Sequence, residues 1–323
     1  MRKLVAGVAL VGLLGTAQPG HAQDYPARPV MMIAPHAPGG GVDIIARIVA
    51  ERMRETLGQM VVVENVPAGA GVVGVERAAR AAPDGYTIVA GDQTSFVVGS
   101  LINSVRYDVL KDFEPVALLS TSPAALVART ELPDKLADLI TRLQTSAGSV
   151  SIGTFGKGSG PHIIAVAFET MTGARLQMVP YRGVAPALQD LVAGRLDLQF
   201  AEVAGMLPHL RGGKLKAYAV LSDRRSPAAP EVPTIEEAGG PRLHVITWRG
   251  VWAPKGTPRD VIARINRAVA GALGDPAVQR RAADLGQDIV PRDQQTPQAL
   301  AAHHRTEMTK WLPMVQAAGA RPD

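Results

Sequence analysis

The sequence predicts an α/β protein built from two domains. Its 323 residues are enough for about two domains with cores of their own, and the 46% of residues that are hydrophobic exclude a disordered chain. Short apolar runs of strand length alternate along most of the chain with segments whose apolar residues repeat at helical spacing. This alternation favours largely parallel sheets covered by helices.

The elements can be assigned in chain order from this alternation. Strands are predicted where apolar and β-branched residues run together, at 30–34, 61–63, 87–90, 116–119, 124–128, 151–153, 178–180, 196–200, 217–221 and 246–252. Helices are predicted where one apolar face repeats, at 44–57, 72–81, 136–143, 162–171, 186–192, 258–273, 276–285 and 298–316. Gly58 is a suitable stop for the first helix, and residues 120–123 resemble a turn between two strands.

The end of the chain decides how the domains are connected. Prolines stiffen a long connection at 222–241, and the last strand is followed by helices alone. Such a chain does not easily form two successive sheets. We therefore predict that it crosses into the second domain near Pro123 and returns near Trp248. The predicted domains are residues 23–123 with 248–323, and residues 124–247, with the final helices covering the first domain.

The N-terminus has the layout of a secretory signal peptide at residues 1–22. Arg2 and Lys3 precede an apolar run at 4–14, which is shorter than the roughly 20 residues that span a bilayer, and cleavage is expected after Ala22. The mature chain is therefore expected in the periplasm. Removing the two cations lowers the net charge from +5 to +3, and no basic run is interleaved with aromatic residues, so no nucleic-acid partner is expected. The absence of cysteine excludes disulfides, thiol nucleophiles and Cys-ligated metals.

Residues 69–74 spell the dinucleotide-binding pattern GxGxxG, and Asp92 follows about 20 residues later. This pattern supports an alternative function, a nucleotide-dependent oxidoreductase that uses Gly69–Gly74. Two observations weigh against it: residues 64–68 separate the glycines from the preceding strand, and the signal peptide takes the chain away from the cytoplasmic nicotinamide pool. We favour glycines that permit a tight turn and close helix packing.

Two other glycine-rich loops lead from a strand into a helix, at 38–43 and 153–162. The second is not a phosphate loop, because Gly158 separates Lys157 from Ser159. Unpaired N–H groups and the helix dipole at such a position favour an anion. Each predicted domain contains one such loop, and the two together are more informative than either loop alone. Asp43 fits a helix cap, a loop clamp or a ligand contact.

Catalytic and metal-binding patterns find little support in the sequence. There is no GxSxG elbow and no HExxH. His162 is interpreted as a hydrogen-bonding residue at a helix start rather than a base, and the adjacent His303 and His304 point to different helical faces. We expect no enzyme activity, no metal and no cofactor.

The order of these motifs resembles the extracytoplasmic solute receptors of tripartite tricarboxylate transporters, the Bug family, over essentially the whole mature chain. The stretches that carry the resemblance include Tyr25-Pro26, Arg28-Pro29-Val30, Pro38-Gly39-Gly40 with Asp43, Val62-Val63-Glu64-Asn65, Gly69-Ala70-Gly71 with Gly74, Ala82-Pro83-Asp84-Gly85-Tyr86-Thr87, Asp112-Phe113-Glu114-Pro115-Val116, Gly158-Ser159 with His162, Val179-Pro180-Tyr181-Arg182-Gly183, Trp248 with Gly250, and Ala253-Pro254 with Gly256-Thr257-Pro258.

The resemblance implies a non-catalytic periplasmic binding protein of type II, with two α/β domains that close over a small carboxylate at a hinge. Carried onto this chain, it places the ligand-binding residues at Pro38, Gly39, Gly40, Gly41 and Asp43, at Asp92, Thr94 and Ser95, at Thr154, Gly158, Ser159 and His162, and at Tyr181 and Arg182. Arg182 fits a solvated helix-start residue equally well, and Trp248 is expected to pack at the hinge. The implied partners are a small organic acid or amino-acid-like ligand and the membrane components of a tripartite transporter or a sensor, and a monomer is expected.

Two departures from the family pattern bear on the ligand. Ala201-Glu202 stands after Phe200 where relatives place Asp or a small polar residue directly after the aromatic, and the segment after Gly91 lacks the usual Asn-Pro. If Glu202 faces the cleft, its charge would favour a ligand with an amino or amide group over a polycarboxylate.

Overall fold

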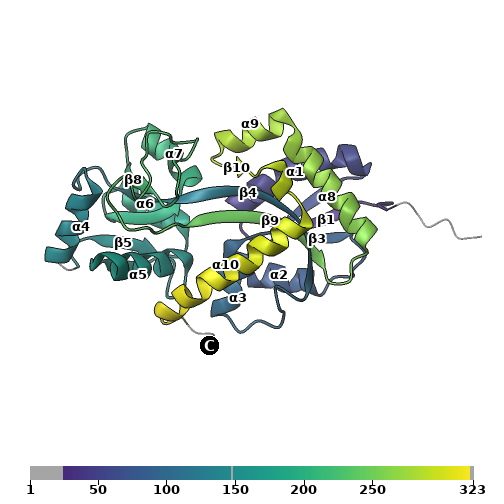
Figure 1. Cartoon of the computed structure of the whole chain (residues 1–323), viewed down its shortest axis with the longest axis horizontal. Helices are drawn as coiled ribbons and strands as arrows, with labels where there is room; N and C mark the ends of the chain where they lie inside the picture. Colours follow the sequence, from purple (N-terminus) through teal and green to yellow (C-terminus); the bar gives the residue numbers. More distant parts are fainter. Residues whose placement is uncertain (1–24, 147, 321–323) are drawn as a thin grey trace, which may run out of the picture.

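The computed structural model describes residues 25–146 and 148–320, so the predicted signal peptide and its cleavage site lie outside the described residues. Within them the strands form one mixed sheet in the order β2-β1-β3-β9-β4-β7-β5-β6, with β8 and β10 also paired to β4. Helices flank this sheet along its length (Figure 1). The α/β class predicted from the sequence is confirmed.

The elements up to residue 102 build one end of the sheet. They are β1 (Val30–Ala34), α1 (Gly41–Leu57), β2 (Val61–Asn65), the 3-10 turn η1 (Gly69–Gly71), α2 (Val72–Ala79), β3 (Thr87–Asp92), the π-helical turn η2 (Thr94–Val98) and α3 (Gly99–Ile102). β1 pairs in parallel with both β2 and β3, and we call these three strands the first half-sheet. Gly58 ends α1 in the left-handed conformation, with φ of 71°, as its place in the sequence predicts.

The elements after residue 135 build the other end. They are α4 (Leu136–Thr145), β5 (Ser151–Thr154), α5 (Gly160–Thr172), β6 (Gln177–Pro180), α6 (Val184–Val192), β7 (Leu198–Glu202), α7 (Val203–Arg211) and β8 (Lys216–Val220). β5 pairs in parallel with β6 and β7, and we call these three strands the second half-sheet.

Two long strands join the half-sheets. β4 (Phe113–Ala128) and β9 (Ile246–Pro254) pair antiparallel from Phe113 to Pro123, and β4 then pairs with β7 and β8 from Ala124 onward. Figure 1 shows both strands running from one group of elements to the other. The partner change at Pro123 lies where the sequence predicts the chain to cross between domains, and the domain boundaries stay a prediction.

The remaining elements complete the helical layers. They are α8 (Arg259–Gly274), α9 (Pro276–Asp284), the short strand β10 (Asp288–Ile289), the 3-10 turn η3 (Arg292–Gln294) and α10 (Pro297–Ala317). α8 packs on α1, whereas α10 lies across β4 and reaches α5 (Figure 1). Trp248 and Trp311 both donate their indole N–H to the buried carboxylate of Glu307, which fixes α10 to β9.

Three sequence predictions differ from the structure. Residues 116–128 form one strand rather than two, because β4 pairs with β9 through Pro123 while its other edge exchanges β10 for β7 near that residue. The final segment is not helical throughout, since β10 pairs with β4. The sheet is mixed rather than largely parallel, because β9 and β4 run antiparallel to their neighbours. α7 and η2 were also not expected, and α7 contains Gly205 and Pro208, which weaken a helical pattern.

In residues 25–146 and 148–320, no helix is both long and apolar enough to cross a membrane.

Candidate ligand-binding site

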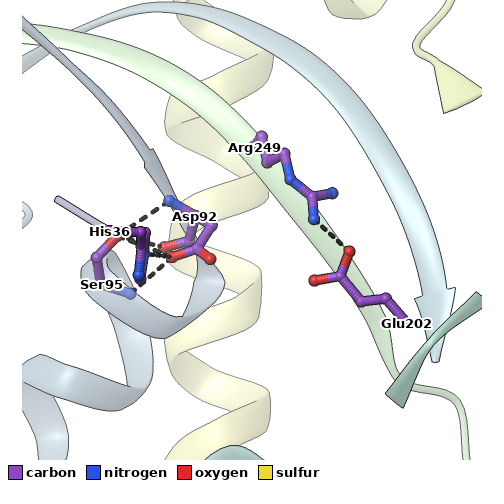
Figure 2. A network of polar contacts seen from close by, with 5 residues as sticks. All are labelled: His36, Asp92, Ser95, Glu202 and Arg249. Carbon is purple, nitrogen blue, oxygen red and sulfur yellow. Dashed lines mark hydrogen bonds and ion pairs between the residues drawn. The ribbon is translucent and has the colours of Figure 1, made fainter. Parts of the chain in front are cut away.

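The carboxyl ends of the two half-sheets come together at one place, joined by Arg249 and Glu202. β3 ends at Asp92, which lies opposite Arg249 of β9 in the register. β7 ends at Glu202, whose Oε2 forms an ion pair with Nη2 of Arg249. Figure 2 shows the two side chains pointing toward each other, with the residues around Asp92 to one side. Because loops at the carboxyl ends of strands form the usual binding crevice of α/β sheets, this is the candidate site.

Asp92 is the centre of a polar network beside β9. Its Oδ1 lies 2.9 Å from Nε2 of His36 and accepts hydrogen bonds from the N–H and the hydroxyl of Ser95, at 2.9 and 2.8 Å. Burial opposes ionisation of Asp92, but His36 and the Ser95 N–H hold the pKa of its carboxyl well below the usual range. Burial likewise opposes the charged form of His36, and the Asp92 carboxylate outweighs it and raises the pKa of the imidazole. The pair is therefore ionic around and below the ordinary pKa of histidine.

Asp43 holds the first glycine-rich loop in place. Its Oδ2 accepts the Gly39 N–H at 2.9 Å, and its Oδ1 accepts from Arg47 and Asn65, both at 2.9 Å. Burial opposes ionisation, yet these donors lower the pKa of the buried carboxyl. Gly39 adopts a φ of 80°, which glycine accommodates without strain. Of the three roles considered for Asp43, this geometry matches the loop clamp, and Gly40 is the N-cap.

The guanidinium of Arg249 rests against the first turn of α1. Its side chain is only 1% exposed. A Cβ built on Gly41 would lie 3.0 Å from Cζ of Arg249 and closer still to Nη2, so a glycine is needed there to accommodate the side chain. Two of its nitrogens, Nε and Nη1, have no hydrogen-bond partner among the described residues.

The second glycine-rich loop is stabilised mainly by its own hydrogen bonds. The hydroxyl of Ser159 donates to the Gly156 carbonyl at 2.7 Å and accepts the Phe155 N–H at 3.1 Å. His162 accepts the Gly158 N–H at Nδ1, 3.3 Å away, and burial together with Lys157 lowers the pKa of its ring. This contact makes His162 a hydrogen-bond acceptor at the start of α5.

This loop also lies against the first group of elements. A Cβ on Gly158 would come within 3.1 Å of Ala320 and 3.6 Å of Ile102 in α3. Thr154, at the end of β5, is buried and accepts the Tyr181 N–H at its carbonyl. The second loop therefore lies against α3 and Ala320, whereas Arg249 connects the start of α1 to β7.

The other predicted residues have varied surroundings. Tyr181 donates its hydroxyl to Asp190 at 3.0 Å, and Arg182 is exposed. Thr94 is half-buried in η2, and Pro38 is exposed at the tip of the first loop. Trp248 is fully buried, its ring centroid 5.8 Å from that of Trp252, and its indole N–H donates to Glu307 of α10.

The segment 69–74 packs on the loop after β1. A Cβ on Gly74 would lie 2.8 Å from Cβ of Pro35, and one on Gly71 would lie 2.7 Å from Cβ of Ser95. These glycines permit close contact of η1 and α2 with Pro35 and with η2, which matches the packing interpretation. Within the described ranges, no group of three or more His, Asp and Glu side chains could hold a metal ion.

Sequence reasoning missed Arg249 and His36. The signal for Arg249 is a single cation in the otherwise apolar strand at 246–254, where an unpaired charge is costly and therefore needs a reason. His36 lies two residues after the end of β1, at the same sheet edge as Asp92. The contact of His36 with Asp92 depends on the pairing of β1 with β3, and the contact of Arg249 with Glu202 depends on β9 and β7 both flanking β4.

Comparison with known proteins agrees with this geometry. A family model described as the tripartite tricarboxylate transporter family receptor matches residues 45–320. Protein BugT of Bordetella pertussis is 36% identical over 325 residues, which covers 99% of each chain. Two solved structures from Rhodopseudomonas palustris are similar: MatC with bound malate (34% identity, TM-score 0.80, 90% of this chain and 100% of that one) and Rpa4515 with adipate (31% identity, TM-score 0.83, 93% and 100%).

Proposed function

This chain belongs to the tripartite tricarboxylate transporter receptor family, and from that premise we propose that it captures a small dicarboxylate between the two half-sheets. The family consists of periplasmic solute-binding receptors, so the chain is a receptor for a small carboxylate and not an enzyme. This function takes the place of the alternative considered from the sequence, a nucleotide-dependent oxidoreductase that uses Gly69–Gly74.

One observation carries the proposal: the carboxyl ends of both half-sheets meet where α1 begins, beside the cations His36 and Arg249. The first N–H groups of a helix have no partner within it and favour an anion. Charge-assisted hydrogen bonds contribute about 1.5–3 kcal/mol each, whereas a micromolar complex needs about 8 kcal/mol. Several donors on the two sides of the cleft reach that figure after offsetting the cost of closure.

Relatives support a dicarboxylate as the ligand class. MatC was solved with malate and Rpa4515 with adipate, each a short chain with a carboxylate at either end. We propose that a ligand of that shape places one carboxylate at the start of α1 and the other at the start of α5.

We assign the site to the residues that the sequence predicts, with roles refined by their contacts. Asp43 and Ser159 shape the two loops, Ser95 orients Asp92, which in turn holds His36, and backbone N–H groups of the loops bind the ligand. The full set is Pro38, Gly39, Gly40, Gly41, Asp43, Asp92, Thr94, Ser95, Thr154, Gly158, Ser159, His162, Tyr181, Arg182 and Glu202.

We further propose export and delivery to a transporter. Residues 1–22 direct the chain to the periplasm, and the loaded, closed form is recognised by the membrane components of a tripartite transporter. A ligand that contacts both half-sheets stabilises the closed form selectively, so the membrane partner can distinguish the loaded receptor from the empty one. Residues 23–123 with 248–323 and residues 124–247 are the two units that move.

Thermal unfolding of residues 23–323 with a ligand panel tests the proposal. We expect succinate, malate or adipate to raise the melting temperature in a concentration-dependent way, since a ligand that binds only the folded state stabilises it. NAD is expected to have no effect. Asp43→Ala and Ser159→Ala should each weaken carboxylate binding while the protein remains folded. Unchanged carboxylate binding in both variants would disprove the two-loop site. Stabilisation by NAD and by no carboxylate would disprove the receptor function for this chain.

A further inference from the structure

We propose that Arg249 binds a carboxylate of the ligand directly, and that Glu202 is a resident counter-ion which the ligand displaces. The inference rests on the proposed function and adds the side chain that selects the ligand.

The guanidinium of Arg249 is buried and has hydrogen-bond donors without a partner among the described residues. Its side chain is 1% exposed, and neither Nε nor Nη1 has a hydrogen-bond partner in the described part of the chain. Buried donors are almost always paired, because leaving one unpaired costs its full desolvation. An unpartnered pair of donors at the meeting point of the half-sheets therefore indicates an acceptor that arrives from outside.

Glu202 occupies only part of the guanidinium. It contacts Nη2 alone, through one oxygen (Figure 2). The Nη2 atom of Arg249 carries two hydrogens, of which one points to the side of Nε and the other to the side of Nη1. A single bond to Glu202 uses one of them, so the other still forms a complete two-donor face with its neighbouring nitrogen. Two-donor faces match the two oxygens of a carboxylate. The Glu202 side chain is 32% exposed, so it can turn toward water when another carboxylate takes its place.

The surroundings favour a second anion rather than a cation. The guanidinium lies at the positive end of α1 beside Gly41, and His36, whose pKa is raised by Asp92, adds a second positive charge when it is protonated. The carboxylate of Asp92 is already committed to His36 and Ser95. Glu202 is itself neutralised by Arg249, which argues against the ammonium-binding role considered for it from sequence.

Binding measured by calorimetry on residues 23–323 tests the exchange, with succinate and alanine as probes. Arg249→Gln should weaken succinate binding on the order of 100-fold, the scale of losing one partner of a buried charged pair. Arg249→Lys keeps the charge without the planar fork and should lose less. Glu202→Gln should strengthen succinate binding about tenfold, the factor expected if the guanidinium is free in roughly a tenth of unliganded molecules.

Arg129→Gln is the matched control, because Arg129 pairs with Asp197 on the same sheet away from the site; it should bind succinate like the wild type. Melting temperatures report whether each variant is folded. Unchanged succinate binding in Arg249→Gln, with a loss in Ser159→Ala, would overturn the inference and leave the receptor function standing. Alanine binding that weakens in Glu202→Gln would also overturn it, because Glu202 would then be a ligand contact. No carboxylate binding by the wild type would overturn both.

Discussion

At the scale of single residues, the site is a balance of four charges. Asp92 faces His36, and Glu202 faces Arg249, so each cation has a carboxylate of its own. Asp92 is held by three donors, whereas Glu202 is half-exposed and contacts a single nitrogen. The carboxylate of the first pair is therefore held by more hydrogen bonds than the carboxylate of the second pair.

Carboxylate binding should depend on the protonation of His36. The groups facing it are Asp92, Arg249 and Glu202, and the pKa of the imidazole is raised. The charged ring is present below that pKa and is lost as pH rises through it, so affinity for succinate should fall in the same range. His36→Gln should flatten this dependence and lower the affinity at pH 6 roughly tenfold. Titrations by calorimetry from pH 5 to 9 measure the effect.

The pair of His36 and Asp92 should also make the stability of the fold depend on pH, and in the same direction as the affinity for succinate. A histidine whose pKa is raised on folding contributes its full stabilisation below its unfolded pKa, and that contribution is lost as pH rises through its folded pKa.

The control for the binding experiment is His209→Gln, on α7, which should keep the wild-type pH dependence of succinate binding. A wild-type profile that does not change over this range would contradict the role given to His36.

Sequence reasoning at this scale found the loops and missed the cations. Asp43, Asp92 and Ser159 follow strands or open helices, which is a local signal, and the glycines beside them mark the turns. Arg249 and Glu202 are 47 positions apart and meet only because β7 and β9 both flank β4. Pairing of that kind depends on the register of three strands, which no local pattern encodes.

At the scale of elements, the start of α1 is shaped by what packs against it. Gly41 is the first residue of the helix, its φ is not positive, and the space that a side chain would fill is taken by Arg249. The glycine is needed for the neighbour, not for the backbone.

Gly41→Ala should therefore separate binding from stability. Alanine is favoured over glycine in a helix by up to about 1 kcal/mol, so the melting temperature should hardly change. The added Cβ displaces the guanidinium, and succinate affinity should fall about tenfold, on the order of 1.4 kcal/mol. Gly205→Ala in α7, where a Cβ meets nothing within 4 Å, is the control. Equal binding by the two variants would show that the guanidinium is not held against α1.

Element prediction succeeded where one signal dominated and failed where tertiary pairing decided. β1 and α1 follow from an apolar run and from a helical face ended by Gly58. β4 reads as two strands because Ser120 and Pro123 resemble a turn. The hydroxyl of Ser120 instead donates to Gln287 at 3.0 Å, beside the short strand β10.

At the scale of the whole molecule, β4 and β9 join the two half-sheets, and α10 lies across β4 and reaches α5. Any ligand held at the carboxyl ends of both half-sheets therefore lies beside the strands that connect them (Figure 1). Family membership supplies the class of ligand, and the charges around Arg249 supply the reason that a carboxylate is bound.

The structure of residues 23–323 in complex with malate or succinate tests this account most directly. The account predicts one ligand between α1 and α5, with a carboxylate in hydrogen-bond contact with Arg249 and with N–H groups at the start of α1, and with Glu202 turned away. A ligand that contacts only one half-sheet, with the ion pair of Arg249 and Glu202 intact, would contradict it.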